Sequence, residues 1–403
     1  MTSVSQTGPA GTPGSPARPA PKWIVGLAAL SLIPVLIEAY AVLWGARRGY
    51  TGRALRDGLD FWTGGRLAIT GRVWTVFDPV AYRHFIAGVF GPALPTHLWS
   101  YPPSYLLLAA AFARLPPWPA VLGFDLASLA LLVLLLRLAG RSWPLILAVA
   151  ASPAALENAV EGQNAALITA LIGGGLLLLE TRPRLAGVLI GLATVKPQLG
   201  LPLPARLLRS PAAFGCAALS ALILMLAARL AFGPHAWAAF WQVTRPAMSN
   251  VLLTGRPRGF AAGLISVFAA VKPFLGVQRA LALQFATAAG AVWLAARTRN
   301  PAILLILCAL ASPYLHGYDL LGVTLAVALL AENRFVHGFH RGELPLFMLC
   351  WIWPGELPWM PLLMHGTPVL LLLLLATALR HDRIQACESR KMANPLLASS
   401  AGP

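Results

Sequence analysis

The sequence predicts an all-α membrane protein that crosses the bilayer several times. Of its 403 residues, 58% are hydrophobic and only 11% are charged, and the mean hydropathy is +0.70. Soluble domains carry roughly 25% charged residues, so most of this chain is too apolar for water. Long apolar runs such as 129–136 and 369–376 do not alternate between apolar and polar residues. Their composition excludes a transmembrane β-barrel.

The net charge of +17, from 31 basic and 14 acidic residues, comes almost entirely from arginine. In a soluble protein so basic a composition would suggest nucleic-acid binding. In a membrane protein, Arg and Lys collect in cytoplasmic loops, where anionic lipid head groups neutralise them. We therefore expect membrane lipids, and no nucleic acid, as partners. The four cysteines are isolated, which indicates packing residues rather than metal ligands.

Composition divides the chain into three parts. Residues 1–22 are rich in Pro, Gly, Ser and Ala, which predicts a disordered cytoplasmic tail. Residues 23–379 hold the apolar segments and form the predicted membrane domain, and residues 380–403 form a second cytoplasmic tail. The first apolar run, 23–46, is too long for a signal-peptide core and predicts a membrane helix. Clusters of arginine then order the later segments into pairs that cross the membrane back and forth, with 143–158 as one crossing.

The longest polar stretch, residues 47–117, predicts a long external loop after the first helix. Its last part, 100–115, is apolar but short and contains Pro102 and Pro103, which predicts a half-helix at the membrane surface. The arginines of this loop violate the positive-inside rule. This exception indicates that they are kept outside by a function, such as gripping an anion.

A helix break is predicted around Lys196-Pro197, because residues 185–208 also contain Pro202 and Pro204. An unpaired ammonium in such apolar surroundings costs roughly a few kcal/mol, so Lys196 needs an anionic partner. That partner is either a lipid phosphate or the carboxylate of Glu161 or Asp319.

Asp60 is a candidate general base, because two aromatic residues follow it and would partly exclude water from its carboxylate. Gly64-Gly65 would leave room for a ligand beside it. From chemistry alone, the alternative of a loop carboxylate paired with Arg56 or Arg66 is favoured over a catalytic role.

Two further pairs of polar residues carry open alternatives. His316 and Asp319, three residues apart at a predicted hairpin tip, either share a helical face toward a substrate or form a helix cap and a surface histidine. Gln163 and Asn164 either cap the next helix or hydrogen-bond a polyol. The sequence contains no paired-histidine, nucleotide-binding or serine-hydrolase motif, so we expect no metal and no cofactor.

The order of short motifs is more specific than any one of them. The series runs Asp60-Phe61-Trp62, Tyr101-Pro102-Pro103, Gly162-Gln163-Asn164, Lys196-Pro197 and Tyr318-Asp319. It resembles glycosyltransferase family 87, the polyprenyl-phosphate-mannose-dependent α-mannosyltransferases of the GT-C superfamily. The resemblance covers about residues 60–320.

The resemblance implies a GT-C-type bundle of about 10–13 transmembrane helices, with short helices in the first external loop. It also implies an inverting enzyme of the bacterial cytoplasmic membrane, with its active site facing outside. This enzyme moves a hexose, typically mannose, from a polyprenyl-phosphate donor to a hydroxyl of a glycolipid or glycan acceptor. A lipid-linked-sugar transporter or flippase, or a non-catalytic membrane scaffold, is the alternative.

The family's catalytic base maps onto Asp60, with Asp57 as its nearest rival. The residues expected to bind substrate are Asp57, Tyr101, Gln163, Asn164, Lys196, His316 and Asp319.

Overall fold

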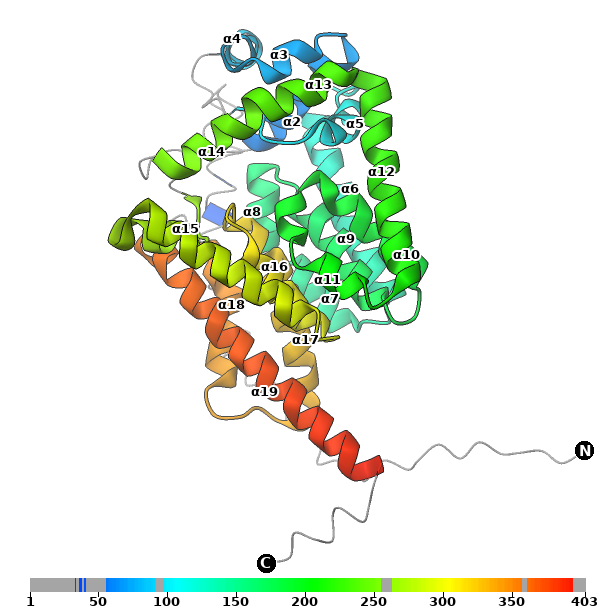
Figure 1. Ribbon diagram of the computed structural model, residues 1–403, viewed down its shortest axis with the longest axis vertical. Helices are drawn as coiled ribbons and strands as arrows, with labels where there is room; N and C mark the ends of the chain where they lie inside the picture. The colour runs from blue at the N-terminus through cyan, green and yellow to red at the C-terminus, as the bar shows by residue number, and fades with distance from the viewer. Residues whose placement is uncertain are drawn as a thin grey trace, which may run out of the picture.

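The structure is a computed structural model, drawn in Figure 1. It describes residues 56–91, 98–254, 263–356 and 361–393, and four earlier positions, 33, 36, 37 and 40. All regular elements in these ranges are helices, which confirms the all-α prediction. The predicted first membrane helix, 23–46, lies outside the described residues except at those four positions, which are helical. The predicted N-terminal tail lies outside them as well.

Three stretches are long and apolar enough to cross a membrane: α6 (Pro117–Leu138), α12 (Pro211–Phe232) and Met364–Ile384, most of which belongs to α19 (Thr367–Ala393). A fourth results if α7 (Trp143–Ala150) and α8 (Pro153–Glu161) count as one broken span. The ranges that the structure describes thus hold three or four candidate spans, fewer than the roughly ten to thirteen expected.

The crossing predicted for 143–158 is not straight, because α7 and α8 meet at a bend of 44°. Ser152 accepts a hydrogen bond from the Ala155 backbone N–H and Pro153 opens α8, so the chain begins a new helix there. The predicted crossing is therefore bent, and the pair still counts as a candidate broken span.

The predicted external loop folds largely into four helices, α2 (Arg56–Ile69), α3 (Val73–Phe77), α4 (Pro79–Phe90) and α5 (Pro103–Phe112). The ten residues of α5 confirm the half-helix predicted within 100–115. Asp78 caps α4, since its Oδ1 accepts hydrogen bonds from the Val80 and Ala81 backbone N–H groups at 2.9 and 3.0 Å.

The sequence suggested that Gly64 and Gly65 leave room for a ligand, but the structure shows that they do not. A β-carbon at Gly64 would lie 2.3 Å from the Trp99 ring, and one at Gly65 would lie 2.2 Å from the Ala109 carbonyl oxygen. Both distances are far below van der Waals contact. The two glycines therefore let α2 pack directly against Trp99 and the backbone of α5.

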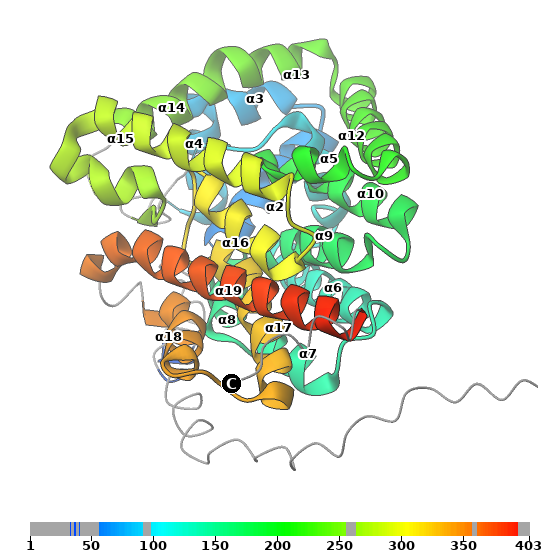
Figure 2. The same cartoon turned by 60° about the horizontal axis from the view of Figure 1, so that its bottom comes forward.

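The centre of the protein is formed by α9 (Ala165–Leu178), which packs against α6, α10 (Pro183–Leu192) and α17 (Leu321–His337). Beside it, α16 (Pro301–Ala311) is buried from Ala302 to Ala311, as its uninterrupted apolar sequence requires. Figure 2 shows this central group from a second direction, with α19 crossing over it.

The segment around Lys196 is broken, as predicted. After α10 come two short 3₁₀ turns, η1 (Ala193–Val195) and η2 (Pro197–Gly200), and then α11 (Leu203–Leu207). Pro197 opens η2 and Pro204 lies in the first turn of α11, since proline is tolerated where a helix begins but not inside it.

The remaining helices follow α12. At Gly233, with φ +79°, the chain turns into α13 (Pro234–Ala239), the π-helical turn η3 (Phe240–Thr244) and α14 (Arg245–Thr254). Next come α15 (Val267–Ala295), which is broken at Gly276, α18 (Glu343–Glu356) and η6 (Pro361–Gly366). The last helix, α19, continues to Ala393, past residue 379 where the sequence placed the end of the membrane domain.

Candidate functional site

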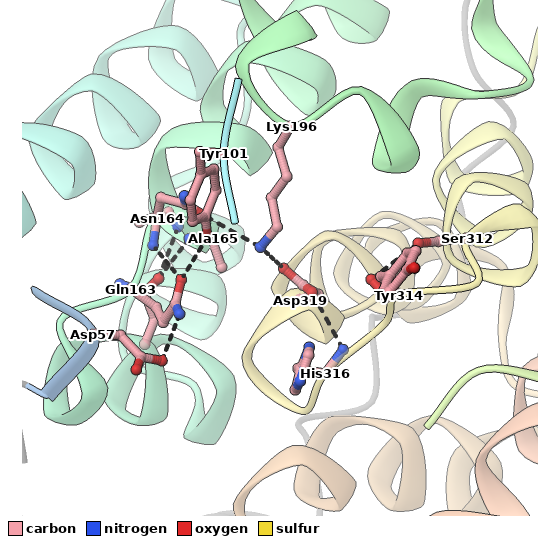
Figure 3. A network of polar contacts seen from close by, with 12 residues as sticks. Asp57, Tyr101, Gln163, Asn164, Ala165, Lys196, Ser312, Tyr314, His316 and Asp319 are labelled. Atoms are coloured by element: carbon pink, nitrogen blue, oxygen red, sulfur yellow. Dashed lines mark hydrogen bonds and ion pairs between the residues drawn. The ribbon is translucent and has the colours of Figure 1, made fainter. Parts of the chain in front are cut away.

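A buried network of polar contacts joins five separate segments of the chain (Figure 3). They are the start of α2, the segment before α5, the turn between α8 and α9, the break after α10, and the turn that leads into η5 (Tyr318–Leu320). The network contains every residue predicted to bind substrate, namely Asp57, Tyr101, Gln163, Asn164, Lys196, His316 and Asp319.

Gln163 connects the first half of the network. Its Nε2 donates a hydrogen bond to Asp57 Oδ2 at 2.6 Å. Its Oε1 accepts from the Tyr101 hydroxyl at 3.4 Å and from the Asn164 backbone N–H at 3.2 Å. One amide side chain therefore ties α2 and the segment before α5 to the α8–α9 turn.

The α8–α9 turn touches α2 through backbone atoms. Gly162 has φ +67°, and a β-carbon there would lie 2.9 Å from the α-carbon of Gly58. A β-carbon at Gly58 would lie 2.5 Å from the Val121 side chain. The close approach and the left-handed backbone both require glycine at 162. This contact and the Asp57–Gln163 hydrogen bond together set the position of α2.

Asn158 caps α9, in place of the two residues considered from the sequence. Its Oδ1 accepts hydrogen bonds from the Ala165 and Ala166 backbone N–H groups at 2.6 and 3.3 Å. Asn164 occupies the N-cap position, but its side chain makes no capping bond and accepts one from Lys196 Nζ at 3.2 Å. Asn158 escaped sequence analysis because it lies six residues before that position, outside the usual capping distance.

Lys196 pairs with Asp319, one of its three predicted partners. The Nζ–Oδ1 distance is 2.6 Å, and the two side chains are 4% and 0% exposed. Nζ also lies 5.0 Å from the centre of the Tyr318 ring. The other Asp319 oxygen accepts a hydrogen bond from the His316 backbone N–H at 3.2 Å. Asp319 therefore fixes both the lysine and the turn that carries His316.

His316 is half-buried and stacks on Tyr318, with ring centres 5.3 Å apart and planes 4° from parallel. The Gly317 that follows it lies against Glu157, since a β-carbon there would be 2.8 Å from Glu157 Oε1. Glu157 is buried beside the network. Its burial could not be predicted, because nothing in its local sequence marks it.

Asp60 lies one helical turn after Asp57 on α2, and it is 7% exposed. The sequence placed it in a loop, whereas the structure places it on a helix. The Tyr82 hydroxyl donates to the Asp60 backbone oxygen at 2.8 Å. Burial, reinforced by the negative charge of Asp60, holds the pKa of Tyr82 well above its usual range. The Tyr82 hydroxyl therefore stays protonated and keeps its donor.

A cluster of aromatic rings begins at Phe61, the residue after Asp60. Phe61 meets the rings of Tyr101 and Tyr105 edge-on, at 5.2 and 5.0 Å between ring centres. Tyr101 and Tyr105 stack at 4.4 Å. Burial raises the pKa of Tyr101 well above its usual range, so its hydroxyl too remains a donor at neutral pH. A small apolar pocket lined by Phe61, Trp62 and Tyr105 adjoins these rings between α2, α5 and α6.

The arginines of the external loop do not join the network as far as the structure describes them. Arg66, Arg72, Arg83 and Arg114 are exposed, whereas the network is buried. An anion held in this site would thus meet Lys196 and His316 rather than these arginines. Over the described ranges, no group of three or more His, Cys, Asp and Glu side chains is arranged to hold a metal ion.

The fold and the site define a helical membrane protein with a buried polar centre, built from segments distant in sequence. Residues 99–315, more than half of the chain, match the model of glycosyltransferase family 87. The chain belongs to this family and is a membrane glycosyltransferase. Searches of the curated proteins and of the solved structures returned no match.

The family match covers only part of the site. It includes Tyr101, Gln163, Asn164 and Lys196. It begins after both aspartates of α2 and ends one residue before His316. The residues outside the match are joined to it through the Asp57–Gln163 and Lys196–Asp319 contacts.

Proposed function

We propose that this enzyme transfers a hexose, typically mannose, with inversion from a polyprenyl-phosphate donor to a hydroxyl of a glycolipid or glycan. Asp60 is the general base. The observation that carries the proposal is the placement of Asp60: a buried carboxylate on a helix whose previous turn is tied to the family's Gly162-Gln163-Asn164 motif.

In this reaction the acceptor hydroxyl gives its proton to the Asp60 carboxylate as its oxygen bonds to the anomeric carbon. The bond between that carbon and the phosphate oxygen breaks on the opposite face of the sugar, and the polyprenyl phosphate leaves with the bonding electrons. One carboxylate is enough for such an inversion, because the phosphate leaves without needing a proton.

The leaving phosphate gains negative charge, which nearby cations and donors stabilise. An ammonium carries three N–H donors. Within the described part of the chain, Lys196 directs two of them to Asp319 Oδ1 and Asn164 Oδ1. The third can meet a phosphate oxygen, with the half-buried His316 ring as a second donor. In this proposal Asp319 positions Lys196 and His316 rather than touching substrate.

In this proposal Asp57, Gln163 and Tyr101 have two roles, one structural and one in substrate binding. Their mutual hydrogen bonds hold α2 against the α8–α9 turn, and in this proposal they also hydrogen-bond the sugar. We propose that this site opens to the outer face of a bacterial cytoplasmic membrane. The arginine clusters at 182/184 and 297/299 support this orientation, since such clusters mark the cytoplasmic side.

A transporter would more often show two related halves, and we call the similar sequences of two segments, Val195–Gly200 and Val271–Gly276, the echo. The two fold differently. Lys196 lies at a helix break in a buried ion pair, whereas Lys272 lies within α15 and donates to the Leu252 carbonyl at 2.9 Å. Gly276 has φ +74° and Gly200 has no positive φ. The echo is therefore no structural repeat and does not favour two related halves.

The proposal is tested by incubating the purified full chain with a panel of polyprenyl-phosphate sugars and a glycolipid acceptor. We expect transfer from the mannose donor, and a product whose anomeric configuration is opposite to that of the donor. Transfer only from nucleotide sugars would overturn the donor class. Retention of configuration would overturn the role of Asp60 as base.

A further inference from the structure

Two surface segments that are far apart in the sequence lie side by side at the Gly233 end of α12. Helix α3 contacts both α13 and η3. The rings of Trp74 and His235 are 5.7 Å apart across this contact. Figures 1 and 2 both show α13 and α14 leaving the end of α12 and running across the molecule beside α3.

The end of α12 marks a membrane boundary. This helix is a candidate span that is mostly unburied by the rest of the protein. Its exposed side chains are large and apolar, for example Leu219, Ile223 and Leu230, so they face lipid. The chain turns at Gly233, and the helices that follow run at an angle to α12. If α12 spans the membrane, α13 and η3 therefore lie where the apolar interior of the bilayer ends.

The exposed side chains at this level suit lipid head groups. Trp74 is 60% exposed and Trp241 is 53% exposed, and tryptophan is enriched at membrane surfaces. Arg72 and Arg245 are also exposed. We call Arg72, Trp74, His235, Trp241 and Arg245 the Arg–Trp patch.

Each arginine of the Arg–Trp patch is held by an aromatic face. The Arg72 guanidinium lies 4.8 Å from the centre of the Phe85 ring, and the Arg245 guanidinium lies 5.1 Å from that of Trp241. A stacked guanidinium keeps its N–H edge open, and that edge matches the oxygens of a phosphate.

The charge around the Arg–Trp patch is positive. Residues 233–262 contain no Asp or Glu in the sequence, and Asp78 is the single acidic residue in 61–124. The Oδ1 of Asp78 is engaged by two backbone N–H groups at the start of α4. These hydrogen bonds hold the pKa of Asp78 below its usual value, so its carboxylate is charged at neutral pH. It offsets only one of the positive charges around the Arg–Trp patch.

We propose that the Arg–Trp patch binds the phosphate groups of anionic phospholipids in the leaflet at the Gly233 end of α12. This gives Arg72, one arginine of the external loop, a role that the buried site does not. Together with Arg245 it holds α3 and η3 to the membrane surface instead of gripping the sugar donor. Salt should weaken the binding, because exposed charges are screened.

The test uses the full chain in vesicles made of equal amounts of phosphatidylcholine and phosphatidylglycerol. Trp241 is replaced by the photoreactive residue benzoylphenylalanine, and the lipids cross-linked to it are identified by mass spectrometry. We expect several-fold more phosphatidylglycerol than phosphatidylcholine, with the preference reduced at high salt.

Two double variants of this photoreactive protein complete the test. Arg72→Gln with Arg245→Gln should bring the two lipids to equal cross-linking. Arg182→Gln with Arg209→Gln, which removes two exposed arginines near the opposite end of α12, should keep the preference. All four arginines are exposed, so both variants should unfold at the temperature of the parent protein.

Equal cross-linking of the two lipids in the parent protein would overturn the proposal, and so would a preference that survives loss of Arg72 and Arg245. Absence of any lipid adduct would overturn it by placing Trp241 outside the head-group layer. None of these measurements requires sugar transfer. A failure here is therefore separate from a failure of the proposed enzymatic function.

Discussion

The Lys196 ammonium and the Asp319 carboxylate, 123 residues apart in the sequence, form an ion pair that is almost fully buried. Asp319 also accepts the His316 backbone N–H. The pair thus connects the broken segment after α10 with the turn before η5. The stability of the site depends on this pair, and so does phosphate binding in the proposed reaction.

Removal of one partner should destabilise the protein strongly. Lys196→Ala leaves the Asp319 carboxylate buried without its counter-ion, and such changes typically cost about 3–5 kcal/mol. We expect a lower unfolding temperature in detergent and a lower yield of monodisperse protein. The double variant Lys196→Met with Asp319→Leu should recover much of this loss, because two apolar side chains need no counter-ion. A Lys196→Ala protein as stable as wild type would contradict the burial of the pair.

Asp60→Asn should fold and bind donor like wild type but transfer sugar about 10²–10⁴ times more slowly, because the amide cannot take the acceptor proton. Asp57→Asn is the matched control. Its amide oxygen can still accept the hydrogen bond from Gln163 Nε2, so substantial activity should remain. Initial rates at equal amounts of folded protein decide between them. Loss of activity at Asp57 alone would move the base one turn earlier on α2.

Gln163→Glu should make stability depend on pH. It places a second carboxylate where the amide now donates to Asp57 at 2.6 Å. Two carboxylates so close cannot both ionise, so one pKa of the pair rises in the folded protein above the unfolded value of roughly 4. The stability deficit relative to wild type should be smallest below about pH 4 and should grow as the pH rises through that raised pKa.

Thermal unfolding of this variant and wild type, measured side by side across a pH series, checks the expectation. Gln163→Leu is the control, because it removes the same hydrogen bond without adding a titrating group. An equal deficit at every pH in Gln163→Glu would mean that residue 163 and Asp57 are not in direct contact.

Gly65→Ala should destabilise the packing of α2 on α5. The new methyl group would meet the Ala109 carbonyl oxygen at 2.2 Å, and overpacking of this kind typically costs about 1–3 kcal/mol. Gly88→Ala, on α4, meets no atom within 4 Å and should be neutral or stabilising by about 0.5–1 kcal/mol. Unfolding temperatures of the two variants should therefore shift in opposite directions or by clearly different amounts.

The outward orientation can be tested with single cysteines in a background where the four natural cysteines are replaced by alanine. Arg83→Cys and Asn250→Cys should react with an impermeant thiol reagent added to intact cells. Arg184→Cys and Arg209→Cys should react only after the cells are broken. All four positions are exposed, so the reagent can reach them. The reverse labelling pattern would mean that the protein has the opposite orientation in the membrane.

Sequence analysis anticipated the parts of the fold that depend on local chemistry. Prolines predicted the short α5 and the break at Lys196-Pro197, because proline acts on its own backbone and its immediate neighbours. The bend between α7 and α8 was missed although Ser152-Pro153 is a helix-start signal, since the apolar composition of 143–158 looked continuous. Helix α19 continues past residue 379, where the hydropathy falls, because charged residues can continue a helix in water.

For the site, the order of motifs pointed to residues that lie together in the structure, but it did not predict which of them contact each other. Whether Lys196 pairs with Glu161 or Asp319 depends on how α10, η2 and η5 pack, which no local pattern encodes. Small residues such as Gly64 and Gly65 can border a ligand, but here they make a close packing contact instead. The seven residues predicted to bind substrate contact one another in one network. Their contacts with a substrate stay predictions.

Helix α2 is attached on both sides of Asp60. Before it, Gly58 touches Gly162 and Asp57 is bonded to Gln163, and after it Gly64 and Gly65 press on Trp99 and α5. A carboxylate carried in this way has little conformational freedom to lose when an acceptor arrives. In the proposed reaction, the orientation of Asp60 is thus set during folding rather than during each turnover, which keeps the entropic part of the activation barrier small. The acceptor would then have to bring its hydroxyl to a carboxylate whose helix is already fixed.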